Sequence, residues 1–211
     1  MTRTLRARLA GKRLAAAAIV AGALAIAPLA ATAASGSTAH PAGSAARLHP
    51  FTIVSPNLRD GGFLPVSAEF GGPGSQGSGC SGQNLAPRLI WFNVPAGTKG
   101  FAFTINDVDA PVAGGFHHWV VYNIPRGHPF LAGHGQNPFS EGTNSYGTIG
   151  YGGPCPPPTG QIHHYIFTVY ALSTAHITGV HITYEQLLAK IAPDVTGATS
   201  IVGKFRLPLH S

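Results

Sequence analysis

The segment Tyr165-Ile166-Phe167-Thr168-Val169-Tyr170-Ala171-Leu172 decides the fold class of this chain of 211 residues. Alternate side chains of an extended strand point to opposite faces of its sheet, and here both alternating sets are largely apolar. A strand of this kind is expected to be covered on both faces. We therefore predict a β-strand at the centre of its sheet.

The same period-two alternation marks other parts of the chain. It occurs at Phe101, Phe103 and Ile105, and again at His118, Val120, Tyr122 and Ile124. Residues 200–209 are predicted to form a closing strand, and residues 71–83, rich in Gly, Ser and Gln, a surface loop. Connections rich in Pro and Gly, in place of amphipathic helices, favour antiparallel sheets packed as a sandwich over a βαβ fold.

One helix is predicted after Thr183, which can cap its N-terminus. Gln186 stands three residues later and completes a capping box. The apolar face of this helix consists of Leu187, Leu188 and Ile191. Pro193 is expected to end it, because proline cannot continue a helix.

Residues 1–33 have the pattern of a signal peptide. Basic residues come first, an apolar run follows from 14 to 30, and the small residues 31–33 fit a cleavage site. The run is broken by Pro28 and is shorter than the roughly 20 residues that span a bilayer. We predict cleavage near Ala34, no transmembrane anchor afterwards, and a secreted or cell-envelope location.

Removing the signal peptide changes the charge of the chain. The whole sequence has 13 basic and 7 acidic residues, and residues 1–33 hold five of the basic ones and no acid. The remaining chain has eight basic and seven acidic residues, a net charge of +1. This charge excludes the strongly basic surface of a nucleic-acid binder. Residues 34–48 read as a flexible spacer, and residues 49–211 as one domain.

Two cysteines, Cys80 and Cys155, lie 75 positions apart. In an exported chain such a pair more often forms a disulfide than a metal site, and two unlinked thiols are the alternative.

Gly72, Gly74 and Gly77 match a Gly-x-Gly-x-x-Gly pattern, but no helix signal follows, so we interpret them as a loop.

Polar residues gather where the predicted strands end, which is where sites are usually built. The four clusters are Asp107-Val108-Asp109-Ala110-Pro111, Phe116-His117-His118-Trp119, Gly152-Gly153-Pro154-Cys155-Pro156-Pro157 and His163-His164-Tyr165. Adjacent histidines on a strand point to opposite faces, so only one of each pair can face a pocket.

Three functions stay open from the residues alone. A metal-assisted or histidine-based hydrolase would use the residues Asp107, Asp109, His118 and His163. However, the chain has no His-Glu-x-x-His, Cys-x-x-Cys, His-x-His or Gly-x-Ser-x-Gly motif. The other two functions are a binding module at the same cleft and a structural protein with a vestigial pocket.

Taken together, the four clusters resemble the phosphatidylethanolamine-binding protein family, and most closely its bacterial Raf-kinase-inhibitor-like branch. Residues 84–91 are also similar to the family's Asn-x-Ser-Pro-x-Leu-x-Trp segment, with Ala86 in place of Ser. The resemblance covers residues 51–205. It implies a mainly β fold, an antiparallel sandwich of a large sheet packed on a smaller sheet, with one or two short peripheral helices.

The resemblance also implies a small pocket for phosphate, acetate-like anions or a phospholipid headgroup such as phosphoethanolamine. By motif position its residues are Asp107, Pro111, His118, Gly153, Pro156, Pro157, His163 and Tyr165. The two histidines and the tyrosine can donate hydrogen bonds to an anion. Asp107 is expected to orient a neighbouring histidine or to meet an ammonium group.

On this resemblance we expect a binding or regulatory protein with no cofactor and no catalytic residues. The resemblance implies that partner proteins could include kinases and proteases. Because an exported protein does not meet a cytosolic kinase, the remaining hypothesis is inhibition of a secreted protease. Besides Ala86, three positions depart from the family pattern. Val108 replaces Pro, and His164 replaces Arg, which alters an ion pair behind the pocket. Asp194 stands where bacterial relatives often have His, which removes a third imidazole near the site.

Overall fold

The computed structural model describes residues 49–71, 78–131 and 139–208. The predicted signal peptide and spacer, and the three glycines of the Gly-x-Gly-x-x-Gly pattern, lie outside these residues. None of the described helices is long and apolar enough to cross a membrane.

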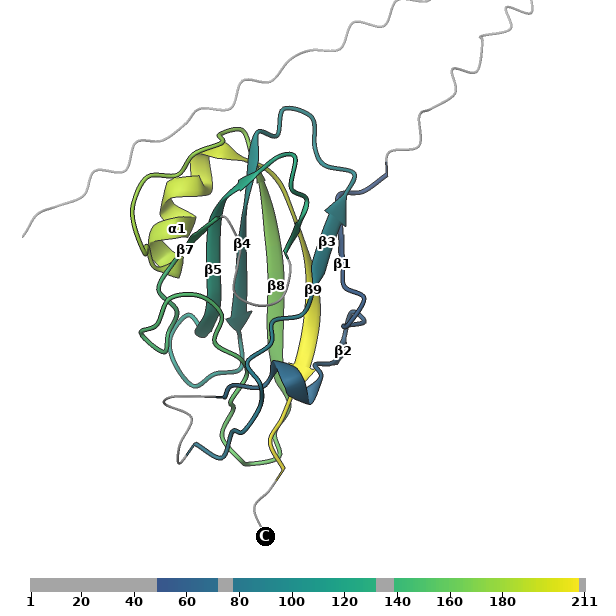
Figure 1. Ribbon diagram of the computed structural model, residues 1–211, viewed down its shortest axis with the longest axis vertical. Coiled ribbons are helices and arrows are strands. Elements are labelled where there is room, and N and C mark those ends of the chain that lie inside the picture. The colour runs from purple at the N-terminus through teal and green to yellow at the C-terminus, as the bar shows by residue number, and fades with distance from the viewer. Residues whose placement is uncertain (1–48, 72–77, 132–138, 209–211) are drawn as a thin grey trace, which may run out of the picture. The chain divides into compact units, whose positions relative to one another are not determined.

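The described residues form two sheets, and the larger has six strands in the order β2-β9-β8-β4-β5-β7 (Figure 1). Their bounds are β2 (Gly62–Phe63), β4 (Gly100–Asp107), β5 (Phe116–Pro125), β7 (Ser140–Glu141), β8 (His163–Leu172) and β9 (Val195–Phe205). β8 pairs with β9 on one side and with β4 on the other, so the predicted central strand is confirmed. Among the described strands of this sheet, all pairs are antiparallel except β2 with β9, which is parallel.

The smaller sheet has the order β1-β3-β6 and packs on one face of the larger sheet. It consists of β1 (Thr52–Val54), β3 (Leu89–Phe92) and β6 (Phe130–Leu131). Trp91 of β3 meets Phe101 of β4 edge to face, with ring centroids 5.2 Å apart. The predicted sandwich is therefore confirmed, and its core lies between the two sheets.

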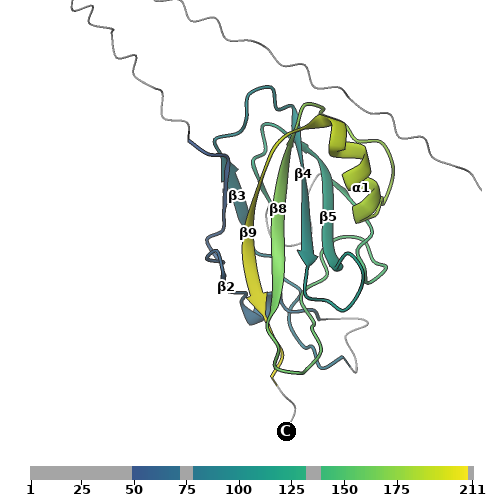
Figure 2. The same ribbon diagram turned by 180° about the vertical axis from the view of Figure 1, so that it is seen from behind.

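The second face of β8 is covered less fully than its sequence predicts. Tyr165, Phe167, Val169 and Ala171 are buried against the smaller sheet, but Ile166, Thr168 and Tyr170 on the opposite face are only half-buried. A separate apolar cluster covers this face beside β4 and β5, and it contains Leu187 and Ile191 of helix α1 together with Ala102 of β4. Figure 2 shows α1 (Tyr184–Ile191) against this face of the larger sheet.

The helix begins as predicted. The Thr183 side chain accepts a hydrogen bond from the backbone of Gln186, and the Gln186 side chain accepts one from the backbone of Thr183, which completes the capping box. A short 3-10 turn, η2 (Ala192–Asp194), contains Pro193 and ends the helical segment.

The closing strand begins five residues earlier than predicted and ends at Phe205. Residues 195–199 lack apolar alternation, and their extended backbone is fixed by pairing with residues 169–172 of β8. A second 3-10 turn, η1 (Val66–Ala68), follows β2.

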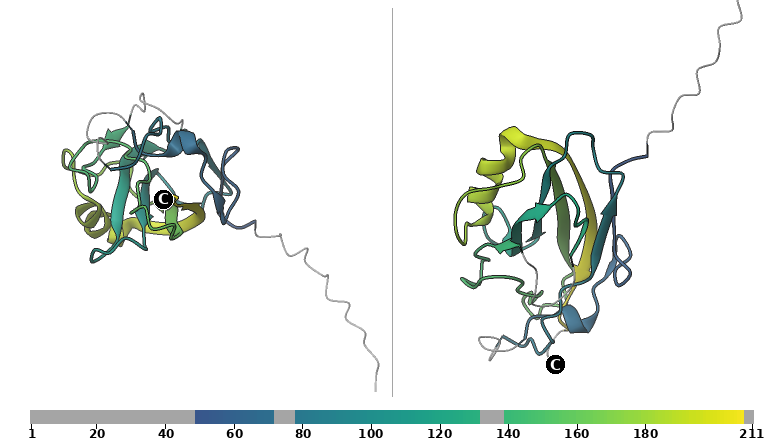
Figure 3. Two further views of the ribbon diagram at one scale, coloured as in Figure 1. Left: turned by 90° about the horizontal axis from the view of Figure 1, so that it is seen from below. Right: turned by 45° about the horizontal axis from the view of Figure 1, so that its top comes forward.

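Cys80 and Cys155 are joined by a disulfide, with their Cα atoms 5.9 Å apart. It links the loop before β3 to the loop before β8. Both loops lie at the end of the larger sheet where β4 and β9 finish and β8 begins, and the left panel of Figure 3 views the molecule from this end.

Candidate functional site

Three strands of the larger sheet bring the predicted polar residues to one place. Asp107 is the last residue of β4, and it lies opposite Phe116 at the start of β5 and opposite Tyr165 near the start of β8. Because these strand pairs are antiparallel, the end of one strand meets the beginnings of the other two. Asp107 and Tyr165, which are 58 positions apart in the sequence, therefore share one edge of the sheet.

The loop from Asp107 to Gly115 turns tightly back into β5. One Asp107 oxygen, Oδ1, accepts the backbone N–H of Asp109 at 3.0 Å, which fixes the first turn. Gly115 has φ +86°, and a Cβ there would lie 2.5 Å from the Asp107 carbonyl oxygen, so the turn requires glycine. No described peptide bond is cis, so the Ala110–Pro111 bond is trans and Asp107 reaches the site without a cis turn.

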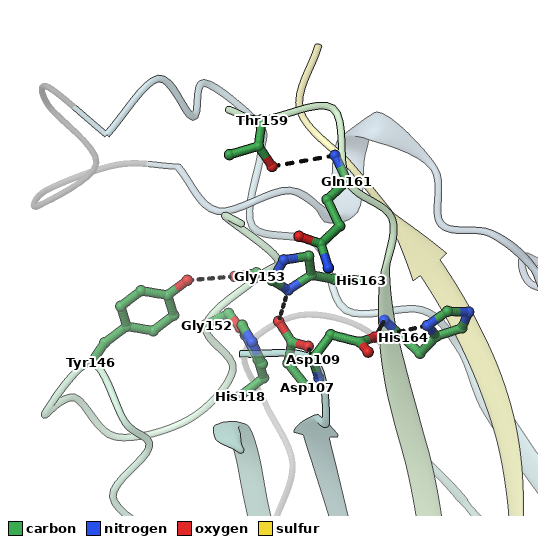
Figure 4. Close-up of polar contacts among 10 residues, drawn as sticks. All are labelled: Asp107, Asp109, His118, Tyr146, Gly152, Gly153, Thr159, Gln161, His163 and His164. Carbon is green, nitrogen blue, oxygen red and sulfur yellow. Dashed lines mark hydrogen bonds and ion pairs between the residues drawn. The ribbon is translucent and has the colours of Figure 1, made fainter. Parts of the chain in front are cut away.

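Asp107 and His163 form a buried hydrogen-bonded pair (Figure 4). The distance from His163 Nδ1 to Asp107 Oδ2 is 2.7 Å. A carboxylate oxygen only accepts, so the hydrogen of this bond belongs to Nδ1 of His163. Asp107 thereby fixes the orientation of the His163 ring.

His118 is held in a comparable way by the chain itself. Its Nδ1 lies 2.6 Å from the carbonyl oxygen of Gly152, which again can only accept. Burial lowers the pKa of His118 to about 4, and this outweighs the opposite influence of the Gly152 carbonyl. The ring is therefore neutral near pH 7, and its single hydrogen is bound to Nδ1.

These two hydrogen bonds determine which ring nitrogen is left for a ligand. The Nδ1–H of His118 is used by the Gly152 carbonyl, and the Nδ1–H of His163 is used by the Asp107 carboxylate, so Nε2 is the remaining nitrogen of each ring. In the neutral His118 ring this Nε2 carries a lone pair and is an acceptor.

A cavity of about 140 Å³ opens between these groups. Its lining residues are Asp107, Ala110, Pro111, Phe116, His118, Tyr146, Cys155, Pro156, Pro157 and His163. Six of the eight residues expected from the family resemblance belong to this lining, and the two others, Gly153 and Tyr165, lie behind it.

Gly153 supports the wall of the cavity. Its N–H donates to Asn84 Oδ1 at 2.7 Å, and its carbonyl accepts the hydroxyl of Tyr146 at 2.9 Å. A Cβ at this position would lie 2.1 Å from the Ala68 carbonyl oxygen, so only glycine allows the two chain segments to approach this closely.

Tyr165 packs under the cavity, with its ring centroid 5.1 Å from that of His118. Burial and the nearby charge of Asp107 raise the pKa of Tyr165, which keeps its hydroxyl protonated.

Two aromatic lining residues, Phe116 and Tyr146, were missed from the sequence. Phe116 belongs to the predicted cluster of residues 116–119 but was not assigned to the pocket, and the structure places it at the start of β5. Tyr146 lies in a loop without periodicity, held by the side chain of Asn144 and stacked on Phe70 at 4.2 Å. Burial raises the pKa of Tyr146, so its hydroxyl remains a hydrogen-bond donor to Gly153.

A second Asp–His pair lies beside the first but does not line the cavity. His164 Nδ1 is 2.7 Å from Asp109 Oδ2, and both side chains are partly exposed (Figure 4). Burial raises the pKa of Asp109, but the hydrogen bonds from His164 outweigh it and leave this pKa lowered. His164 is the residue that departs from the family pattern, and its partner is this aspartate.

His117 points to the opposite face of β5 from His118, as the strand geometry predicts. Its ring stacks on Tyr184 of α1 at 3.9 Å, and its Nδ1 lies 3.4 Å from Glu185. Burial lowers the pKa of His117 despite this carboxylate. The residue therefore joins β5 to the helix and has no contact with the cavity.

In the part of the chain that the structure describes, no group of three or more His, Cys, Asp and Glu side chains is arranged to hold a metal ion. Of the four residues considered for a hydrolase, Asp107, His118 and His163 line the cavity and Asp109 does not. Asp107 and His163 pair with one another, Asp109 pairs with His164, and His118 binds a carbonyl.

Comparison with known proteins gives consistent matches. The family model described as "Phosphatidylethanolamine-binding protein" matches residues 54–206. YbcL of Escherichia coli is 40% identical over 135 residues, which cover 60% of this chain and 71% of YbcL. LppC of Mycobacterium tuberculosis, whose name describes it provisionally as a lipoprotein, is 38% identical over 158 residues, or 74% of this chain and 72% of LppC.

A solved structure agrees with these matches. The crystal structure of E. coli YbcL, titled as a new member of the mammalian PEBP family, superposes with a TM-score of 0.68 at 32% identity. The superposition covers 74% of this chain and 98% of the YbcL chain.

Proposed function

Because the chain belongs to the phosphatidylethanolamine-binding protein family, we propose that it is an exported binding protein whose pocket holds a small anion or a phospholipid headgroup and leaves it chemically unchanged. The observation that carries this proposal is the buried Asp107–His163 pair, which lies at the wall of a small cavity together with His118.

The size of the cavity favours a small ligand or headgroup. At about 140 Å³ it is well below the roughly 300–1,000 Å³ of pockets that enclose drug-sized molecules. Prolines and Phe116 form its apolar walls, so a bound polar group would be shielded from water. Shielding strengthens each hydrogen bond that the ligand makes with the histidines.

The lining favours binding over covalent turnover. Among the described residues that line the cavity there is no Ser, Thr or Lys, and Cys155 is held in the disulfide. The Tyr146 hydroxyl is a poor nucleophile because its pKa is raised by burial. Export is supported by the Cys80–Cys155 disulfide, which is a bond typical of oxidising compartments.

Calorimetric titration of the purified, metal-analysed protein with inorganic phosphate and with phosphoethanolamine tests this function. We expect saturable binding with one site, independent of metal and lost in His118→Ala. A wild-type protein that binds neither ligand would reject the proposal. Binding that appears only with a stoichiometric metal would instead support the metal-assisted hydrolase.

A further inference from the structure

A second cavity lies at the edge of the larger sheet, where the short strand β2 pairs with the end of β9 (Figure 2). Its volume of about 560 Å³ falls within the roughly 300–1,000 Å³ of sites that enclose small organic molecules. We call it the edge cavity, and it shares no described lining residue with the cavity beside the histidines. Its walls are mainly apolar, with side chains that include Phe63, Leu64, Val66, Phe205 and Leu207.

One carboxylate, that of Glu69, lines this apolar cavity. Glu69 is only 5% exposed, and its Oε1 accepts the backbone N–H of Ser81 at 3.0 Å. Its Oε2 accepts no hydrogen bond from a described residue, and none of the ion pairs among the described residues includes Glu69. Buried charges in proteins are normally paired, so the second oxygen of Glu69 has the capacity to accept from a cation.

This second oxygen keeps access to the cavity. Among the described residues, four side-chain polar atoms are fully buried without a hydrogen-bond partner, and Glu69 Oε2 is not one of them. Because the atom has no partner and is not fully buried, it lies at the surface of the cavity that Glu69 lines.

The position of the carboxylate is fixed by the chain around it. The backbone N–H of Glu69 donates to the Val66 carbonyl at 3.0 Å, and its carbonyl accepts the N–H of Asn84 at 2.9 Å. Ser81, which holds Oε1, directly follows Cys80 of the disulfide. A carboxylate that is already held in place costs less free energy to order when a ligand binds.

The protein's own cations near the cavity are engaged elsewhere. Lys204 Nζ lies 5.5 Å from the centre of the Phe63 ring, and Arg206 Cζ lies 5.9 Å from it. Arg206 also lines the cavity, but it is exposed, so water and salt screen its charge. A ligand cation can therefore reach Glu69 without displacing an internal ion pair.

We propose that the edge cavity binds a small organic amine, that is, a primary ammonium group on an aliphatic or aromatic stem. The ammonium donates to Oε2 of Glu69, and the stem packs against the apolar walls. A neutral ligand of the same shape leaves the carboxylate without a cation, and an anionic ligand is repelled by it. The alternative role of Glu69 is to fasten the loop at Ser81, and this role alone predicts no preference among such ligands.

A panel of matched ligands tests the proposal on the unaltered protein by calorimetric titration. Phenylbutylamine, phenylbutanol and phenylbutyrate share one stem and differ in charge. We expect the amine to bind at least about tenfold more tightly than the alcohol, because a hydrogen bond to a charged group is the stronger kind, and the carboxylate to bind most weakly. Benzylamine, with a shorter stem, should bind about tenfold more weakly than phenylbutylamine, because it buries fewer methylene groups.

The backbone amide of Ser81 reports whether the amine binds at Glu69. This amide donates to Glu69 Oε1, so its proton and nitrogen chemical shifts respond to a cation on the same carboxylate. We expect these shifts to saturate at the amine concentrations that saturate the calorimetric signal. Saturable binding that leaves the Ser81 amide unchanged would place the amine elsewhere and overturn the proposal.

The variant Glu69→Gln separates charge from structure. The amide keeps an oxygen for the Ser81 N–H and nearly the same size, so the melting temperature should change little, whereas the preference for amine over alcohol should fall below about threefold. Asp60→Asn is the matched control, because Asp60 Oδ1 also accepts a backbone N–H, from Val202 at 2.8 Å, but Asp60 is exposed and does not line the cavity. This control should keep the wild-type preference.

An amine and an alcohol that bind the unaltered protein within about threefold of each other would reject the proposal, as would a Glu69→Gln variant that keeps the wild-type preference. The variant His118→Ala should bind phenylbutylamine as the unaltered protein does, because the edge cavity lies apart from the histidines. Loss of amine binding in this variant would contradict a separate site. Phosphate titrations address the other cavity, so the proposed function stands or fails independently.

Discussion

Replacing Asp107 by Asn tests whether the buried Asp107–His163 pair holds the pocket in its binding geometry. The substitution keeps the size of the side chain and an oxygen that can accept from His163 Nδ1, but it removes the charge. A hydrogen bond to a charged group contributes about 1.5–3 kcal/mol net, and a neutral one about 0.5–1.5 kcal/mol. We therefore expect the free energy of unfolding to fall by about 1–2 kcal/mol in urea denaturation.

Phosphate affinity in the same variant should fall by about tenfold or more, because a neutral amide holds the His163 ring in its binding orientation less firmly than a carboxylate does. Calorimetric titration of folded protein measures this directly. Near-ultraviolet circular dichroism of the variant shows whether the aromatic core remains intact.

Asp109→Asn is the control, since it makes the same chemical change in a pair with the same 2.7 Å distance. The side chains of the control pair are 31% and 44% exposed, whereas those of the buried pair are 5% and 4% exposed. Exposed pairs contribute about 0–1 kcal/mol, so this control should lose little stability and no affinity. Equal losses in the two variants would refute the role assigned to Asp107.

Three further predictions concern stability and the pocket wall. Replacing both Cys80 and Cys155 by Ser should lower the free energy of unfolding by roughly 4 kcal/mol in the chain-entropy model; a loss below about 1 kcal/mol in guanidinium unfolding would contradict it. The pKa of His118 is lowered from 6.5 in the unfolded chain to about 4 in the fold, so acidification between these values favours the unfolded state. The free energy of unfolding should therefore fall by about 3 kcal/mol over this pH range. His118→Gln should lack this component of the pH profile. Gly153→Ala should displace the wall against the Ala68 carbonyl and weaken phosphate binding at least about tenfold, and unchanged binding with unchanged melting temperature would show that the contact is not tight.

Local patterns predicted the elements that local physics controls. The alternation in residues 165–172 gave the central strand, and the Thr183 and Gln186 side chains gave the start of α1. The strand at residues 195–199 could not be foreseen, because a segment with Gly197 and Ala198 has little β pattern of its own and is held by pairing with β8.

The site residues likewise divide into those that sequence motifs predict and those that only the tertiary fold brings together. Motif positions placed six of the lining residues, but Tyr146 and the support from Asn84 come from loops that only the tertiary fold brings to Gly153. The protonated nitrogen of His118 likewise depends on the Gly152 carbonyl, 34 positions away. Sequence therefore identified the histidines but could not assign which nitrogen faces a ligand.

The most direct test of an anion site between the two histidines is nitrogen-15 NMR of the imidazole rings during titration with phosphate. The chain has 11 histidines, so those outside the pocket serve as internal controls in the same spectrum. We expect saturable shifts confined to Nε2 of His118 and of His163, with their Nδ1 atoms remaining protonated. Shifts spread over exposed histidines such as His164 and His176, with none at His118 and His163, would contradict the anion pocket.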